Sequence, residues 1–167
     1  MARSFFSRLV WMAALVLLQA LVFNHIHWFG YATPYVVVYI LCLQPLDTSR
    51  CGWLLWGFFA GLASDFFSGV PGVGAVSMTL AAMCAPRILA LFAPKDCLED
   101  MVPGYLTLGG WKYVQYVSWL VLLQQAAAVV LEFFSFFNGL ELLYTYLCSS
   151  ALTAVLLLVL EKMRGGR

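Results

Sequence analysis

The sequence predicts an all-α integral membrane protein in which six transmembrane helices form one compact bundle, and three observations lead to that fold class. Of the 167 residues, 63% are hydrophobic and only 10% are charged, whereas soluble domains carry about 25% charged residues. The apolar residues gather in runs that are long enough for spans of roughly 20 residues each. The basic residues fall at alternate ends of those runs. We therefore expect residues 1–167 to form a single membrane domain with no soluble part.

Polar, glycine-rich or proline-containing breaks divide the chain into the six expected spans. In order, these spans cover Phe6–Phe23, Tyr31–Leu46, Cys51–Phe67, Gly74–Phe92, Tyr113–Phe134 and Leu142–Leu160. The first follows a basic start but lacks a small-residue cleavage site, so we interpret it as an uncleaved span and not as a signal peptide. Pro34 falls in the first turn of the second span, where its missing N–H costs little. Pro86 is expected to interrupt or end the fourth span.

The distribution of basic residues predicts the orientation. All nine Lys and Arg residues lie near the start of the first span, between the second and third, around the loop between the fourth and fifth, or after the last: Arg3, Arg8, Arg50, Arg87, Lys95, Lys112, Lys162, Arg164 and Arg167. The other three loops contain none. Because Lys and Arg are retained in cytoplasmic loops, we expect a multi-pass membrane protein with both termini in the cytoplasm. The net charge of +1 gives no indication of nucleic acid binding.

The most informative stretch is Trp56–Ala75, which starts as an apolar helix and ends in a glycine-rich turn. Gly57 and Gly61 stand four residues apart and share one helix face, which Ser64 and Ser68 continue. Small residues on one face of a membrane helix allow a neighbouring backbone to approach closely. The sequence therefore predicts that this face packs against another span, either internal or from a partner protein.

Asp65 marks the end of this helix, where an acid is costly unless it is paired, hydrated or functional. Gly69, Pro71, Gly72 and Gly74 follow and are expected to stop the helix and reverse the chain. A functional interpretation gives the carboxylate a partner, a cation or a substrate amine to bind. A structural interpretation makes it a cap that accepts hydrogen bonds from backbone N–H groups of the turn. The two interpretations are compatible, and both stay open.

Other polar residues give weaker indications of function. His25 and His27 are most simply solvated at the membrane interface, and Glu132 is a secondary candidate because apolar residues surround it. The cysteines form no CxxC pair and are interpreted as small buried hydrophobic residues: Cys42, Cys51, Cys84, Cys97 and Cys148. The sequence has no HExxH motif, no phosphate-binding loop and no rows of intramembrane charge. We therefore expect no enzymatic activity, no metal and no cofactor.

The run Gly57–Ala75 resembles the signature of the rod shape-determining protein MreD family. In that family a glycine-rich helix carries an aspartate and is followed by a serine, a glycine-proline-glycine-like turn and a helix of small residues. The matching positions here are Gly57, Gly61, Asp65, Ser68, Gly69, Gly72 and Gly74. Three flanking segments resemble landmarks of MreD proteins of the Bacteroidetes type: His27–Pro34, Pro94–Asp96 and Leu131–Phe136. One departure is Gln124-Gln125, where a histidine pair is expected.

The resemblance implies a multi-pass protein of the bacterial inner membrane that acts as a non-enzymatic scaffold of the cell-wall elongation complex and helps maintain cell shape. It implies association with MreC and, through it, with the actin-like MreB, the glycosyltransferase RodA and the elongation transpeptidase. The family is also similar in fold to the small substrate-binding subunits of energy-coupling vitamin transporters. That similarity supplies an alternative function, a membrane subunit that binds a vitamin or an ion. In the scaffold, the helix-packing face and the turn that follows it are the possible partner contact: Gly57, Gly61, Ser64, Asp65, Ser68, Gly69, Pro71, Gly72 and Gly74.

Overall fold

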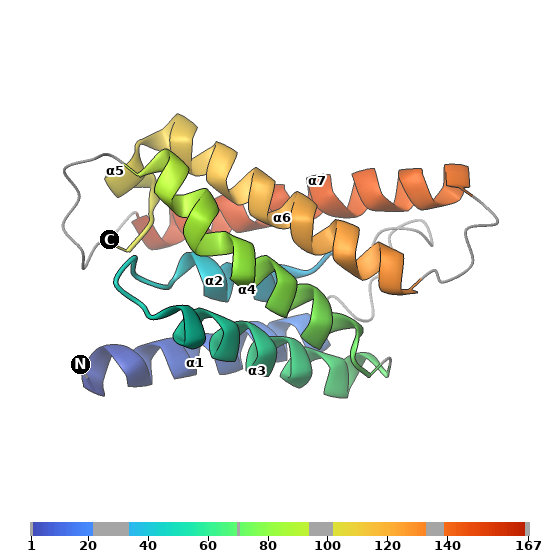
Figure 1. Ribbon diagram of the computed structural model, residues 1–167, viewed down its shortest axis with the longest axis horizontal. Helices are drawn as coiled ribbons and strands as arrows, with labels where there is room; N and C mark the ends of the chain where they lie inside the picture. The colour runs from blue at the N-terminus through green and yellow to red at the C-terminus, as the bar shows by residue number, and fades with distance from the viewer. Residues whose placement is uncertain (1, 22–33, 70, 94–101, 133–138, 166–167) are drawn as a thin grey trace.

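The computed structural model describes residues 2–21, 34–69, 71–93, 102–132 and 139–165, and every regular element in these ranges is helical (Figure 1). The all-α class predicted from the sequence is therefore confirmed. In chain order the elements are α1 (Ala2–Leu21), the 3₁₀ helix η2 (Val36–Val38), α2 (Tyr39–Cys42), α3 (Arg50–Ser68), α4 (Val73–Phe92), α5 (Tyr105–Leu108), α6 (Gly110–Glu132) and α7 (Gly139–Gly165).

Three helices are long and apolar enough to cross a membrane: Val73–Phe92, Gly110–Leu131 and Leu143–Arg164. The described chain is thus compatible with a membrane protein. Pro86 does not end α4, which continues to Phe92. Proline lacks an N–H and removes one hydrogen bond of the helix, but it leaves the following turn free to continue. The interruption expected at this position is therefore absent.

The second expected span, Tyr31–Leu46, differs most from the structure. Within its described part, only Val36–Cys42 is helical, and this run is about 12 Å long, far less than a hydrocarbon core of about 30 Å. The chain then turns, with Leu43 N–H donating to the Ile40 carbonyl and Gln44 N–H to the Leu41 carbonyl. Pro45 follows and cannot continue a helix because it has no N–H to donate.

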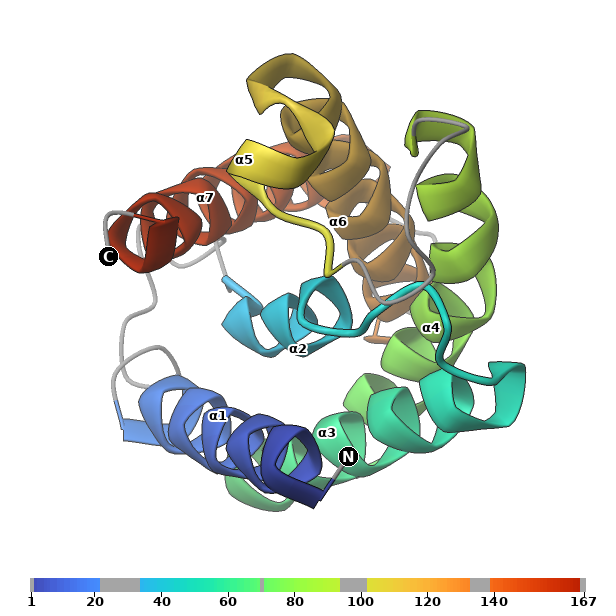
Figure 2. The ribbon, with the colours of Figure 1, turned by 90° about the vertical axis from the view of Figure 1, so that its left-hand side faces the viewer.

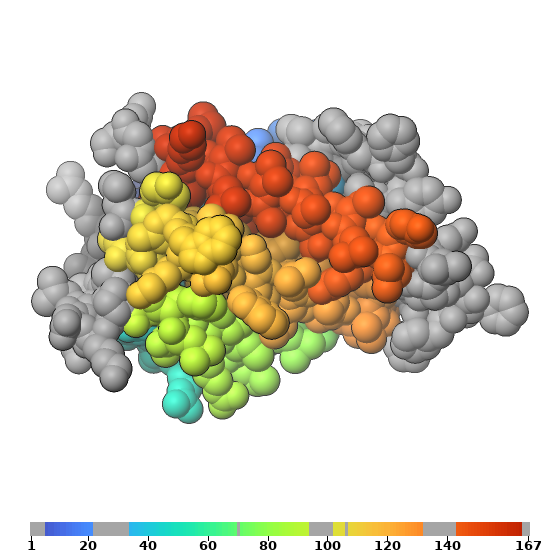
Figure 3. Space-filling model, turned by 90° about the horizontal axis from the view of Figure 1, so that it is seen from above, coloured from blue at the N-terminus to red at the C-terminus, as the bar shows by residue number. Residues whose placement is uncertain are grey.

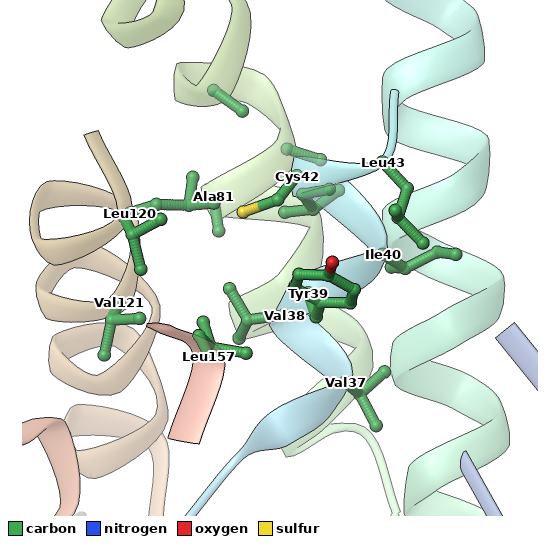
Figure 4. Packing of buried hydrophobic residues seen from close by; sticks show 14 of the residues in the cluster. Val37, Val38, Tyr39, Ile40, Cys42, Leu43, Ala81, Leu120, Val121 and Leu157 are labelled. Atoms are coloured by element: carbon green, nitrogen blue, oxygen red, sulfur yellow. The ribbon is translucent and has the colours of Figure 1, made fainter. Parts of the chain in front are cut away.

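The short central segment, residues 34–44, lies in the middle of the bundle. Viewed along the bundle, α1, α3, α4, α6 and α7 surround it (Figure 2). Every side chain from Val36 to Cys42 is 0% exposed. Ile40 and Leu43 point to one side of this segment, and Cys42 points toward Ala81 and Leu120 on the other (Figure 4). The segment therefore forms the hydrophobic core around which the longer helices pack.

The outer faces of the long helices are apolar and exposed. Figure 3 shows the face that α4, α6 and α7 build together. The exposed residues include Leu91 on α4, Trp119 on α6 and Val155 on α7, all more than half exposed. Apolar side chains at such positions are what lipid tails contact in a membrane protein.

The two ends of the bundle differ in charge. The helices α1, α3 and α6 begin at the end of the bundle where α4 and α7 finish (Figure 1). The basic residues of the described chain lie within about two turns of those helix ends: Arg3, Arg8, Arg50, Arg87, Lys112, Lys162 and Arg164. We call this the basic end. The turn between α3 and α4 lies at the opposite end and carries Asp65 beside it.

Candidate functional site

Asp65 lies at the end of α3 with both carboxylate oxygens hydrogen bonded to the chain that follows. Oδ2 accepts from the N–H groups of Gly72 at 2.9 Å and Ala75 at 2.9 Å, and Oδ1 accepts from that of Gly74 at 2.8 Å. Gly72 is the N-cap of α4, so these are N–H groups that the first turn of a helix leaves without partners. The side chain is 5% exposed. This geometry agrees with the capping interpretation of Asp65.

The glycines of the turn supply backbone conformations that other residues adopt poorly. Gly69 ends α3 with φ 74° and Gly72 begins α4 with φ 98°. Both angles lie in the left-handed region, where a Cβ atom would strain the backbone. Together with Pro71, which is exposed, they reverse the chain within a few residues and bring the first turn of α4 to Asp65.

The small-residue face of α3 packs against α4 inside the same chain. A Cβ atom on Gly57 would lie 2.7 Å from Ala82 Cβ and 2.9 Å from the Met78 carbonyl oxygen. A Cβ atom on Gly61 would meet the backbone of the first turn of α4, 2.7 Å from Ala75 Cα. The sequence left two possible packing partners for this face, another span of the same chain or a second protein. At Gly57 and Gly61 the structure shows the first, because α4 of the same chain covers both glycines.

The two serines of that face differ from each other. Ser64 is buried, donates to the Gly61 carbonyl at 2.8 Å and shares a hydrogen bond with the Tyr35 hydroxyl. Ser68 is exposed and its hydroxyl bonds only to carbonyls of its own helix among the described contacts. The helix interface therefore ends at Ser64, and Ser68 belongs to the outer surface of the turn.

Tyr35 connects the hairpin to the central segment. A Cβ atom on Gly74 would overlap both the Tyr35 hydroxyl and Asp65 Oδ1. Gly74 is therefore the point where the α3–α4 turn and the central segment meet. No sequence pattern indicated this contact, because Tyr35 lies about 30 positions before its partners.

Gln19 of α1 holds the start of the central segment and was not singled out from the sequence. Its Nε2 donates to the Pro34 carbonyl at 2.8 Å, and its Oε1 accepts from the Val36 N–H at 2.9 Å. One side-chain amide thus pairs with both a donor and an acceptor of a non-helical backbone. Irregular backbone inside a membrane is tolerated only where such groups find partners. The one feature of the sequence that could have indicated this role is the position of Gln19, a polar residue within an apolar run.

A second group of polar side chains holds the same end of the segment from the other side. The Tyr35 N–H donates to Thr153 Oγ1 of α7 at 3.1 Å, and Gln125 Nε2 of α6 donates to the same oxygen at 3.2 Å. Gln124 Nε2 lies 3.4 Å from the Ser77 hydroxyl of α4. Gln124 and Gln125, which replace the expected histidine pair, therefore serve as buried polar links between helices.

The middle of the central segment is held by a buried acid. Glu161 of α7 is 5% exposed and accepts a hydrogen bond from the Tyr39 hydroxyl at 2.6 Å. It also accepts from the Tyr105 N–H at 3.3 Å and pairs with Arg164 at 3.3 Å. The sequence placed Glu161 after the last span, but α7 continues through it to Gly165. Its structural role was missed because Lys162 and Arg164 follow it, so the sequence there resembles a solvated charged tail.

Several sequence candidates have other outcomes. Glu132 is the last residue of α6, but its side chain lies outside the described residues, as do His25 and His27. Cys42 is buried as expected, whereas Cys51 and Cys148 are exposed, so the expectation of burial is wrong for these two. Both lie on the outward faces of their helices, Cys84 is half-buried, and Cys97 lies outside the described residues. In the described ranges, no three His, Cys, Asp or Glu side chains gather as a metal site would require.

Replacing Gln19 by leucine is expected to lower the free energy of unfolding by about 2 kcal/mol, because the Pro34 carbonyl and the Val36 N–H would be buried without partners. Thermal unfolding in mild detergent measures the loss. Gln115→Leu is the matched control, since Gln115 is a half-buried glutamine of α6 away from the central segment. Equal stability of Gln19→Leu and Gln115→Leu would show that Gln19 does not hold the segment.

No protein-family model, no curated protein and no solved structure matches this chain.

Proposed function

We propose that this protein is a non-enzymatic membrane scaffold of the cell-wall elongation machinery, as its resemblance to the MreD family implies. In this role it helps maintain cell shape by organising an MreC-like partner and, through that partner, MreB, RodA and the elongation transpeptidase. It lies in a bacterial inner membrane with its basic end in the cytoplasm, following the rule that Lys and Arg are retained there. The α3–α4 turn then faces the outside of that membrane.

One observation supports this proposal most: both buried carboxylates of the described chain, Asp65 and Glu161, bond to other parts of the same chain. Asp65 accepts three backbone hydrogen bonds at the start of α4. Glu161 accepts from Tyr39 and Tyr105 and pairs with Arg164. A catalytic acid or an ion ligand needs an oxygen that points at its substrate. Carboxylates that instead cap helices and join elements support a rigid scaffold.

The partner contact in this proposal is the outer surface of the α3–α4 turn. Phe67 is 50% exposed there, and Ser68, Gly69 and Pro71 are exposed beside it. Asp65 fixes the backbone of this turn from the inside, so its exposed surface has a fixed shape. A preorganised surface loses little conformational entropy when a partner binds.

Co-purification tests the proposal. The tagged full chain is isolated from membranes of its host in mild detergent, and the accompanying proteins are identified. Recovery of an MreC-like protein or of wall synthases is the expected result. Phe67→Ala should reduce that recovery several-fold, whereas Trp119→Ala, a change on the exposed face of α6, should not. Recovery of ATPase subunits or of a tightly held vitamin would contradict the scaffold.

The alternative, a ligand-binding subunit of a transporter, is favoured by a different observation. Five buried polar atoms have no hydrogen-bond partner within the part of the chain that the structure describes: Gln44 Nε2, Trp53 Nε1, Tyr113 Oη, Tyr116 Oη and Gln124 Oε1. Each costs about 1–3 kcal/mol if it stays unpaired, so a small polar ligand that bonds to one or more of them inside the bundle would remove part of that cost. Mass spectrometry of small molecules released from the purified protein distinguishes this function from the scaffold.

A further inference from the structure

A groove runs along the outer surface between α1 and α3. Its volume is about 710 Å³, and its walls are apolar, with Leu9 and Met12 on α1 and Gly52, Trp56, Ala63 and Phe66 among the residues on α3. From Gly52 to Phe66 it extends about 21 Å along α3, which exceeds the roughly 15 Å of one membrane leaflet. Phe66, at its far end, is 85% exposed. The groove is therefore long, apolar and open to the membrane.

A cation stands where this groove reaches the basic end of the bundle. Arg8 lies one turn before Met12 on the same face of α1. Its Nη1 donates to Gln44 Oε1 at 3.0 Å, which occupies one of the five N–H donors of a guanidinium. The other charged residues of this end near α3 are Arg50 and Asp47, which are both exposed. A half-buried arginine therefore lies one turn from the groove wall at Met12, with one N–H of its guanidinium bonded to the buried Gln44.

We propose that this groove is a phospholipid site, with an acyl chain along α1 and α3 and the lipid phosphate at Arg8. Basic pockets between membrane helices recognise lipid headgroups in this way, because a phosphate gains more from an arginine near the membrane surface than from water. The walls supply the apolar contact for the chain, and the arginine supplies the preference for a phosphate. This site is independent of the scaffold, so either proposal can fail alone.

The walls of the groove favour a flexible chain over a second helix. Close packing of two membrane helices is favoured by small residues one turn apart on one face. The small residues of this groove, Gly52 and Ala63, stand eleven positions apart with Leu55, Phe59 and Leu62 between them. The pair with helix-packing spacing, Gly57 and Gly61, faces α4 instead. An acyl chain can follow this wall of mixed small and large side chains, and it needs no pair of small residues one turn apart.

Native mass spectrometry of the full chain in detergent tests the site, with phosphatidylglycerol and a diacylglycerol of the same chains as probes. The wild type should bind phosphatidylglycerol about fivefold more tightly, which corresponds to about 1 kcal/mol for one cation near the headgroup. Arg8→Gln should remove that preference and Arg8→Lys should keep it. Ala63→Phe, which fills the groove, should weaken binding of both lipids.

Three matched variants keep the test specific. Lys112→Gln removes an exposed cation elsewhere at the basic end, and Ala151→Phe adds the same bulk on the exposed face of α7, so both should bind as the wild type does. Gln44→Met removes the contact of Arg8 but not its charge, and it should keep the preference for phosphatidylglycerol. An unchanged preference in Arg8→Gln, or unchanged binding in Ala63→Phe, would overturn the proposal. A photo-crosslink from residue 63 to a partner protein, with no lipid retained, would overturn it as well.

Discussion

Gly61→Ala is expected to lower the free energy of unfolding by about 3 kcal/mol, the upper part of the range for overpacked cores. The added methyl group would lie 2.7 Å from Ala75 Cα and against the Gly74 carbonyl group. Both neighbours are backbone, so neither can move aside as a flexible side chain would. The helices α3 and α4 would have to separate along their interface. Thermal unfolding in mild detergent, with insertion checked by membrane fractionation, measures the loss.

Two other glycines provide a graded comparison for Gly61. Gly57→Ala should be destabilising but cost less, because the added methyl group would lie 2.7 Å from Ala82 Cβ and 2.9 Å from the Met78 carbonyl oxygen, and these contacts are less close than those at Gly61. Gly110→Ala should be neutral or slightly stabilising, because the added methyl meets only the Tyr105 side chain, which is 54% exposed and can move. Alanine also favours helix over glycine. If Gly61→Ala were as stable as Gly110→Ala, the close approach of α3 and α4 at the turn would be wrong.

Asp65→Ala is expected to cost about 3 kcal/mol as well, because three N–H groups at the start of α4 would lose their acceptor. Asp65→Asn should cost about half as much. The asparagine oxygen can still accept from Gly72 and Ala75 in the place of Oδ2, but its NH₂ group would face the Gly74 N–H. The negative charge beside the first turn of a helix is lost in both variants. Thermal unfolding and hydrogen exchange at residues 72–75 measure the two effects.

The comparison of the two variants separates hydrogen bonding from charge. Asp47→Ala, which removes an exposed acid from the basic end, serves as the control and should lie within about 0.5 kcal/mol of the wild type. Equal losses for Asp65→Asn and Asp65→Ala, at equal protein levels, would show that the charge itself is required. The capping interpretation would then be wrong even though the geometry permits it.

The long helices were predictable because residues close to their ends determine where they begin and stop. Cys51–Phe67 was expected for α3, which spans Arg50–Ser68, and Gly74–Phe92 for α4, which spans Val73–Phe92. In both cases an apolar run ends at glycine, proline or charge. The cap at Asp65 was predictable for the same reason, since its three partners follow within ten residues.

The central segment was not predictable, because what allows it to be short comes from distant positions. Its first backbone groups bond to Gln19 and Thr153, which are 17 and 118 positions away from the residues they hold. By hydropathy alone, Tyr31–Leu46 resembles the other expected spans. From the sequence alone, Gln19 is interpreted as a polar residue that an apolar helix tolerates, and Glu161 as part of a charged tail. Their roles depend on which helices meet, and a single sequence does not contain that information.

The short central segment also shows that two sequence patterns of this chain measure different things. The charge pattern follows how often the chain reverses direction, whereas the hydropathy pattern follows how many segments are long enough to cross a bilayer. Residues 34–44 carry the chain back toward the basic end (Figure 1), although their helical part is only about 12 Å long. A segment that carries the chain from one end of the bundle to the other places the next loop at the opposite end, even where its helical part is shorter than a bilayer. The alternation of basic and uncharged loops therefore counts reversals and fixes their parity. Hydropathy counts segments of full membrane thickness, and in this fold the two counts need not be equal.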